Sequence, residues 1–124
     1  MESRITVLVV DHEDLFRNMI ADLLRERGHT VFTAAGRDEV FAILERQPEI
    51  ALVFLHTNLR GPSGIAVFEE IMRQSNPPRV IMMTGTEETE IFRVMKAGAA
   101  GFLIKPFSLG DMENAIASAL PGGV

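Results

Sequence analysis

Short apolar runs alternate with amphipathic stretches along the whole chain. The runs are rich in branched and large apolar residues and end at polar or turn residues, which is typical of strands buried on both faces of a sheet. The run at 29–34 alternates apolar and polar residues more than the others, so we expect it at a sheet edge. The pattern predicts strands at 5–10, 29–34, 52–58, 80–83 and 101–104.

Between these runs, apolar residues recur at helical spacing, and local signals mark the helix ends. Gly28 and Gly98 stand where a glycine suits the end of a helix, and Ser108 and Asp111 have the spacing of a capping box. This predicts helices at about 13–27, 37–46, 65–75, 87–97 and 109–119. In the first helix the apolar positions at helical spacing are Leu15, Phe16, Met19, Ile20, Leu23 and Leu24. The first turn of the fourth helix should expose Glu87, Glu88 and Glu90 near the positive end of its dipole.

Strands that alternate with helices require a parallel sheet covered by helices on both faces. Because crossovers between parallel strands are right-handed and this chain has 124 residues, we expect a doubly wound α/β three-layer sandwich with strand order 2-1-3-4-5. We expect one domain over 1–124, with its core at about 4–120 and a frayed end or the start of a linker at 121–124.

Composition narrows the possible functions. A net charge of -5 argues against direct nucleic-acid binding, and the absence of cysteine removes disulfides and thiolate metal sites. No apolar run approaches the ~20 residues of a membrane span, so we expect a cytoplasmic protein with no membrane partner. No glycine-rich phosphate loop follows the first strand, which gives nucleotide binding little support.

Polar side chains follow four of the predicted strands. The carboxyl ends of parallel strands share one edge of a sheet, where ligands usually bind, so these side chains should converge on one shallow pocket. They are Asp11, His12 and Glu13 after the first strand, His56 and Asn58 at the end of the third, Thr84 after the fourth, and Lys105 after the fifth.

The order and spacing of these stretches resemble the receiver domain of bacterial two-component response regulators, which has a flavodoxin-like fold. The similarity extends from Arg4 to about Leu120 and rests on 7–11, on Gly64 eight residues after His56, on 83–85 and on 97–107. The resemblance implies a phosphoryl-accepting site with Mg²⁺. In that site Asp11 matches a metal-binding acid, Asn58 a backbone carbonyl ligand, Thr84 a hydroxyl that turns toward the phosphoryl group, Lys105 the lysine beside the acceptor, and Phe102 a switch aromatic.

Three positions depart from the family pattern. His56 stands where the family has the phosphoaccepting aspartate, His12 stands at the second acid, and Arg60 replaces a proline. An aspartyl phosphate requires a carboxylate nucleophile, and Mg²⁺ prefers oxygen ligands. We therefore expect no conventional phosphorylation, no enzymatic activity, and no cofactor beyond Mg²⁺ held weakly, if at all, by Asp11, Glu13 and Asn58.

The resulting hypothesis is a pseudo-receiver that acts as a phosphorylation-independent interaction module. Its expected partners are a histidine kinase, an effector domain or a second receiver, contacted through the face formed by the fourth helix, the fifth strand and the fifth helix. One alternative keeps phosphorylation with a relocated acceptor such as Asp11. Another is a flavodoxin-like redox or nucleotide protein, although a shared fold does not carry function.

The individual residues also have simpler interpretations. Asp11 and Glu13 could cap the first helix, Thr84 could begin a turn, Lys105 could pair with either acid, and Phe102 could serve only in packing. For His12 and His56 three further alternatives stay open: a two-histidine, one-carboxylate site for a transition ion with Asp11, pH sensing near Lys105, and phosphohistidine at His56.

Overall fold

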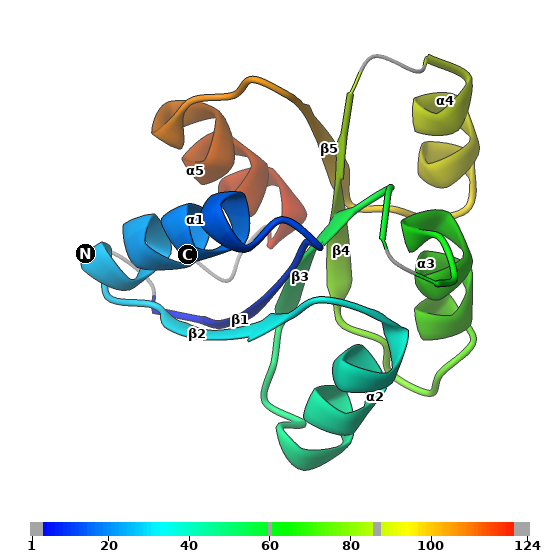
Figure 1. Cartoon of the computed structure of the whole chain (residues 1–124), viewed down its shortest axis with the longest axis horizontal. Coiled ribbons are helices and arrows are strands. Elements are labelled where there is room, and N and C mark those ends of the chain that lie inside the picture. Colours follow the sequence, from blue (N-terminus) through cyan, green and yellow to red (C-terminus); the bar gives the residue numbers. More distant parts are fainter. Residues whose placement is uncertain (1–3, 60, 86–87, 121–124) are drawn as a thin grey trace.

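The computed structural model describes residues 4–59, 61–85 and 88–120, without the side chains of 88–90. Its parallel sheet has five strands in the order β2-β1-β3-β4-β5, which confirms the predicted topology and the edge position of 29–34 (Figure 1). The elements in chain order are β1 Thr6–Val10, α1 Asp14–Glu26, β2 Thr30–Ala34, α2 Arg37–Arg46, β3 Leu52–His56, α3 Gly64–Met72, β4 Arg79–Thr84, α4 Glu88–Lys96, β5 Gly101–Ile104 and α5 Leu109–Ala119.

Helices cover both faces of the sheet. In Figure 1, α1 and α5 lie on one side and α2, α3 and α4 on the other. Successive side chains of a strand point to opposite faces, so each inner strand supplies two cores. In β1, Val7 and Val9 join the core under α1 and α5, whereas Leu8 and Val10 join the core under the other three helices. This double burial explains why the inner strands are almost entirely apolar.

The helix ends follow the local signals. Gly28 takes a φ of 91° directly after the C-cap residue of α1, a conformation that favours glycine. At the start of α5, the Ser108 side chain accepts from the Asp111 backbone and the Asp111 side chain accepts from the Ser108 backbone, so the predicted capping box is present. The strand predicted at 52–58 ends at His56, two residues early, because the chain turns there into the loop before α3.

Not all of the apolar positions on α1 face the core. Leu15 is 90% exposed and Met19 is 50% exposed, whereas Ile20 and Leu24 are fully buried. Leu15 and Met19 are four residues apart and therefore share one side of the helix, which turns away from the sheet. The predicted exposure of Glu87, Glu88 and Glu90, the departure at Arg60 and the terminal segment 121–124 lie outside the described residues and side chains.

Candidate functional site

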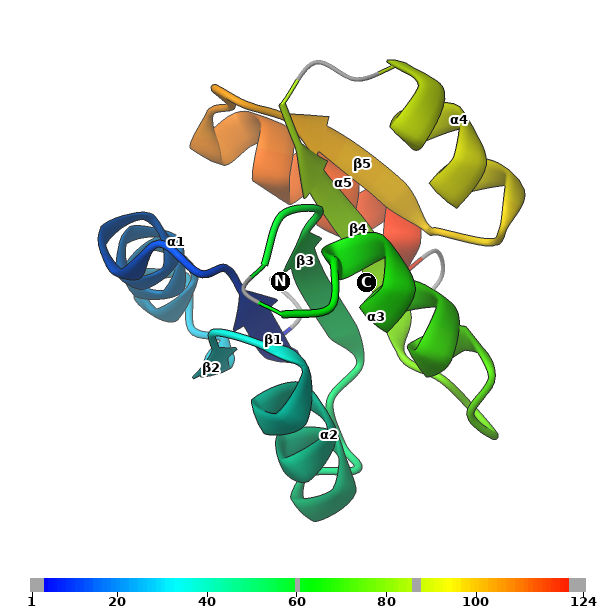
Figure 2. The same ribbon diagram turned by 45° about the vertical axis from the view of Figure 1, so that its right-hand side comes forward.

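The strand ends of the sheet bring the predicted polar residues together. Because β1 pairs with β3, the residues that follow Val10 lie beside those that follow Leu55. Figure 2 shows the loops after β1 and β3 next to each other at this edge. Asp11, His12 and His56 each offer a ligand atom, and these three atoms lie within 4.8 Å of one another. We call these three residues the Asp-His-His cluster.

Asp11 is the buried carboxylate of the cluster, with no exposed surface. Its Oδ1 accepts a hydrogen bond of 2.9 Å from the backbone N–H of Glu13, which directly precedes α1. Its Oδ2 lies 3.5 Å from Nζ of Lys105. Asp11 therefore stabilises the start of α1, whereas the Glu13 side chain makes no capping hydrogen bond.

Lys105 reaches this carboxylate from the end of β5, the edge strand that β3 and β4 separate from β1. Its Nζ also lies 3.5 Å from Oε1 of Glu13 and 3.7 Å from the centre of the Phe16 ring. Its backbone N–H donates to the carbonyl of Thr84 at 2.9 Å, and its peptide bond with Pro106 is cis. The ammonium group is thus held between two carboxylates and an aromatic face, so it has both ion-pair and cation–π contacts.

The two imidazoles meet at the Asn58 carbonyl. Nδ1 of His12 lies 2.9 Å from this oxygen and Nδ1 of His56 lies 3.0 Å from it. The Asn58 N–H also donates to Nδ1 of His56 at 3.0 Å, so in that arrangement the proton of neutral His56 is on Nε2. The ring centroids are 6.1 Å apart, and His56 is buried while His12 is partly exposed.

The loop after β3 returns tightly to the strand end. Gly64 begins α3 and its N–H donates to the carbonyl of Thr57 at 2.8 Å. A Cβ at Gly64 would lie only 1.8 Å from the backbone oxygen of His56. Only glycine permits this approach, which places the start of α3 against the residue at the centre of the site.

The remaining candidates lie at β4 and β5. Thr84 is buried, and among the described residues its Oγ1 has no hydrogen-bond partner. Phe102 on β5 pairs in register with Met82 and is 39% exposed, so it contributes to the surface as well as to packing.

The sequence interpretation missed two members of the site. Phe16 was interpreted only as an apolar position of the first helix, but its ring contacts Nζ of Lys105. Arg17 was not assigned a role, but its Nη1 donates to the backbone carbonyl of Asp11 at 2.9 Å. Both residues lie on the first turn of α1, one turn after the acids. That proximity to the strand end was the available signal, but it does not reveal which side of the helix faces Lys105.

Known proteins match this chain in both sequence and fold. The family model of the response regulator receiver domain matches residues 7–117. The chain belongs to the receiver domain family. Receiver domains interact with kinases and effector domains and are generally regulatory rather than catalytic.

Individual relatives place this receiver domain among proteins of different lengths. It is 30% identical to the transcriptional regulatory protein PdtaR of Mycobacterium tuberculosis over 89% of this chain and 54% of PdtaR. It is 31% identical to the two-component response regulator-like protein PRR37 of Oryza sativa over 89% of this chain, but spans only 15% of PRR37.

Solved receiver structures share the fold. A receiver domain protein from Clostridium thermocellum has a TM-score of 0.86 at 29% identity, with 93% of both chains covered. NtrX from Brucella abortus has a TM-score of 0.87 at 30% identity, over 97% of this chain and 28% of NtrX. Within the described part of this receiver domain, no helix has the length and apolar character needed to cross a membrane.

The Mg²⁺ that the family implies does not fit the donors of this receiver domain. Mg²⁺ requires near-octahedral oxygen coordination, whereas the three side chains that converge here supply one carboxylate and two imidazoles. Glu13 is not part of that convergent set, and its carboxylate is directed to Lys105. The oxygen donors are therefore reduced to Asp11 and the Asn58 carbonyl.

Proposed function

We propose that this receiver domain signals by binding partners rather than by forming an aspartyl phosphate. The observation that carries the proposal is the side chain at the end of the central strand β3, where His56 supplies a buried imidazole in place of a carboxylate. An acyl phosphate forms only on a carboxylate. Nδ1 of His56 is also engaged by the Asn58 N–H, which leaves that nitrogen unprepared for phosphoryl transfer.

The retained ion pairs support a static rather than a switching role. In this receiver domain Lys105 is paired with Asp11 and Glu13, so the cationic side chain has carboxylate partners without any phosphoryl group. Under the proposal these contacts hold β1, α1 and β5 together, and the domain presents a constant surface.

A relocated acceptor at Asp11 is the second candidate, because Asp11 is the buried carboxylate nearest to Lys105. Two contacts oppose it. Oδ1 already accepts from the Glu13 N–H and Oδ2 faces Lys105, so an incoming phosphoryl donor would have to displace one of them. The site has no exposed carboxylate oxygen of Asp11 for that attack.

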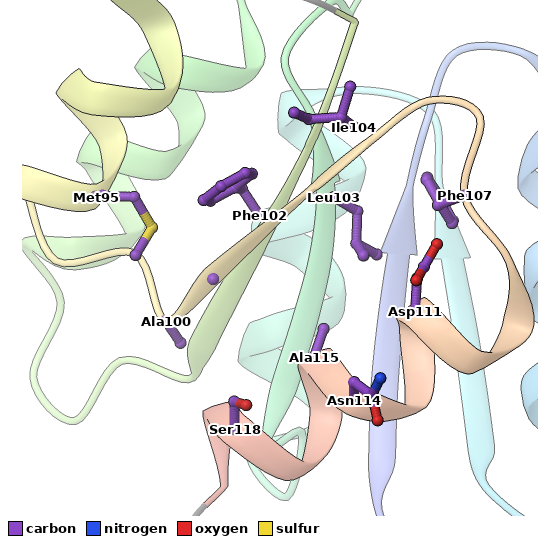
Figure 3. Close-up of a pocket in the computed structure, with 11 residues that line it drawn as sticks. Met95, Ala100, Phe102, Leu103, Ile104, Phe107, Asp111, Asn114, Ala115 and Ser118 are labelled. Atoms are coloured by element: carbon purple, nitrogen blue, oxygen red, sulfur yellow. The ribbon is translucent and has the colours of Figure 1, made fainter. Parts of the chain in front are cut away.

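The proposed partner surface is the groove between α4, β5 and α5. Figure 3 shows Met95 at its α4 side, Phe102 and Ile104 on β5, and Asn114 and Ser118 along α5. Apolar side chains are exposed there, which suits a protein partner more than a small charged ligand. We propose that a second copy or an effector domain binds this groove, with a histidine kinase as a further partner.

The relative PdtaR suggests the kind of effector that this receiver domain regulates. PdtaR is named as a transcriptional regulatory protein, and this receiver domain spans about half of it. We propose that the domain acts in the cytoplasm on an attached or separate effector of that regulatory kind, without contacting nucleic acid itself, since its net charge is -5.

Incubation with acetyl phosphate and Mg²⁺, followed by intact mass spectrometry, tests the proposal. We expect no gain of about 80 Da, the mass of one phosphoryl group, for the unsubstituted domain. The matched positive control is the double variant His12→Asp/His56→Asp, which restores both carboxylates of the family pattern and should gain that mass. A gain in the unsubstituted domain would overturn the proposal, and its loss in Asp11→Asn would identify Asp11 as the acceptor.

A further inference from the structure

We propose that the Asp-His-His cluster binds a divalent transition ion, for which Zn²⁺ is the natural probe. The cluster unites Asp11, His12 and His56 from the ends of two neighbouring strands, with their ligand atoms within 4.8 Å of one another. Imidazole is a good ligand for Zn²⁺, Ni²⁺ and Cu²⁺, and one carboxylate completes a set common in such sites. The same side chains that exclude Mg²⁺ therefore suit a softer ion.

The distances between donors are close to those of a formed site. Oδ1 of Asp11 lies 3.7 Å from Nδ1 of His12, and the Asn58 carbonyl lies 2.9 Å and 3.0 Å from the two Nδ1 atoms. Metal–ligand bonds of about 2.0–2.2 Å place adjacent donors roughly 3.0–3.5 Å apart. The Asn58 carbonyl is thus positioned as a fourth donor, and only small side-chain movements are needed.

The surroundings hold these donors in place and leave an entry path. Asp11 and His56 are buried at the ends of β1 and β3, so their positions are set by the sheet. The His12 side chain is 33% exposed, which opens one side of the cluster to solvent. An ion can enter there without unfolding the strand ends.

The local charge favours a cation. Asp11 and Glu13 share the single ammonium of Lys105, whereas the nearby Arg17 guanidinium pairs with Asp14 at 2.9 Å. The strand end therefore carries one carboxylate more than the cations paired with it. A divalent ion at Oδ1 of Asp11 would leave Oδ2 with Lys105.

Binding requires only a change in imidazole hydrogen bonding. Each neutral imidazole has one lone pair and one N–H, and the proton can reside on either nitrogen. If Nδ1 of His56 binds the ion, it gives up the hydrogen bond from Asn58; if Nε2 binds, that hydrogen bond is lost through the change of tautomer or ring rotation. In either case the imidazole stays neutral and no covalent step is involved.

Calorimetric titration of the tag-free domain with ZnCl₂ tests this inference. We expect one Zn²⁺ per chain, and at least about tenfold weaker binding for His12→Gln and for His56→Gln, since even an outer partner of a metal site contributes tenfold or more. The matched control is His29→Gln, the remaining histidine, which should bind Zn²⁺ as the unsubstituted domain does. Heat no greater than a buffer blank, or unchanged affinity in both His12→Gln and His56→Gln, would overturn the inference.

Electron paramagnetic resonance of the Cu²⁺-loaded, unsubstituted domain provides a test that needs no variant to fold. We expect nitrogen hyperfine coupling from imidazole ligands, and its absence at one equivalent of Cu²⁺ would contradict the site. Millimolar Mg²⁺ should leave Zn²⁺ affinity unchanged, because Mg²⁺ is not the ion these donors prefer. Both readouts are independent of the acetyl phosphate experiment, so failure of metal binding and failure of the proposed signalling mode are distinguishable.

Discussion

Nζ of Lys105 lies 3.5 Å from Oδ2 of Asp11, across 94 positions of sequence. The carboxylate has no exposed surface, and the lysine side chain is largely shielded between it, Glu13 and the Phe16 ring. This contact joins the end of β1 to the end of β5, on opposite sides of the central strand. The receiver domain thus has a charged connection through the pocket that also contains His56.

Replacing Lys105 by methionine should destabilise the domain. The substitution keeps a long side chain but leaves the buried Asp11 carboxylate without its cation. Breaking a fully buried pair costs about 3–5 kcal/mol, and we expect about 2 kcal/mol here because the lysine is partly exposed. Urea unfolding measures the loss.

The control for this substitution is the chain's other lysine, Lys96, which is exposed on α4. Lys96→Met should change the free energy of unfolding by less than about 0.5 kcal/mol. Equal stabilities of the two variants would show that the contact between Lys105 and Asp11 contributes nothing.

Gly64→Ala should disrupt the site, although Gly64 is not a member of the Asp-His-His cluster. The new Cβ would lie 1.8 Å from the His56 oxygen and 2.8 Å from Cα of Thr57, and neither backbone atom can move without displacing β3. We expect a loss of more than about 3 kcal/mol in the free energy of unfolding, which belongs to the severe class of single substitutions. Thermal denaturation followed by circular dichroism measures the effect.

Gly110→Ala is the matched control, because Gly110 also lies in the first turn of a helix. Its added Cβ would meet Ser108 Oγ at 3.6 Å, an ordinary contact, and alanine is better than glycine in a helix by up to about 1 kcal/mol. We expect Gly110→Ala to be as stable as the unsubstituted domain or slightly more so. A comparable loss in both variants would contradict the close approach at Gly64.

Arg37 and Glu70 join α2 to α3 and should make stability depend on pH. Nε of Arg37 donates to Oε1 of Glu70 at 2.9 Å, and Nη2 donates to Oε2. This hydrogen bonding holds the pKa of Glu70 below its ordinary value of 4.5. Because the pKa of Glu70 is lowered in the folded state, the ionised Glu70 contributes to the stability of the fold. This contribution to stability is complete above pH 4.5 and is lost as the pH falls through the lowered pKa.

Comparison with Glu70→Gln over a pH series checks this dependence. The difference in melting temperature between the two proteins should be small and should not vary with pH near neutrality. It should decrease when the pH is lowered below 4.5. In Arg37→Met, the pKa of the Glu70 carboxyl, followed by carbon NMR, should return toward 4.5. An unchanged Glu70 titration would contradict the role of Arg37.

Ile104→Lys should weaken self-association through the α4–β5–α5 groove without unfolding the domain. Ile104 is 42% exposed on β5, so a charge there costs little in the monomer but opposes burial of the groove against a second copy. Sedimentation equilibrium should show a weaker dimer than for the unsubstituted domain.

The control places the same substitution on an exposed apolar residue outside the groove. Leu15 on α1 is 90% exposed, and Leu15→Lys should leave association unchanged. A monomer for the unsubstituted domain at all accessible concentrations would contradict self-association through this groove.

The local sequence pattern was enough to predict the strands of the sheet. It was not enough to predict which apolar side chains of a helix are buried. The run at 52–58 identified a strand buried on both faces because its apolar residues are continuous, and the sheet order followed from the handedness of crossovers. The spacing on α1, by contrast, was compatible with Leu15 and Met19 in the core. Helical periodicity defines a stripe, and its edges depend on how the helix is rotated against the sheet, which no local residue sets.

By itself, the sequence determined the fold and the residue types delivered to the carboxyl edge, since strand periodicity and strand ends depend on neighbouring residues. It therefore placed His56 at the end of the central strand. Only the tertiary structure decided that both imidazoles meet at the Asn58 carbonyl and that Lys105 contacts Asp11, Glu13 and Phe16 together. Those contacts depend on the register, twist and loop paths of β1, β3 and β5, which arise from packing among segments far apart in the chain.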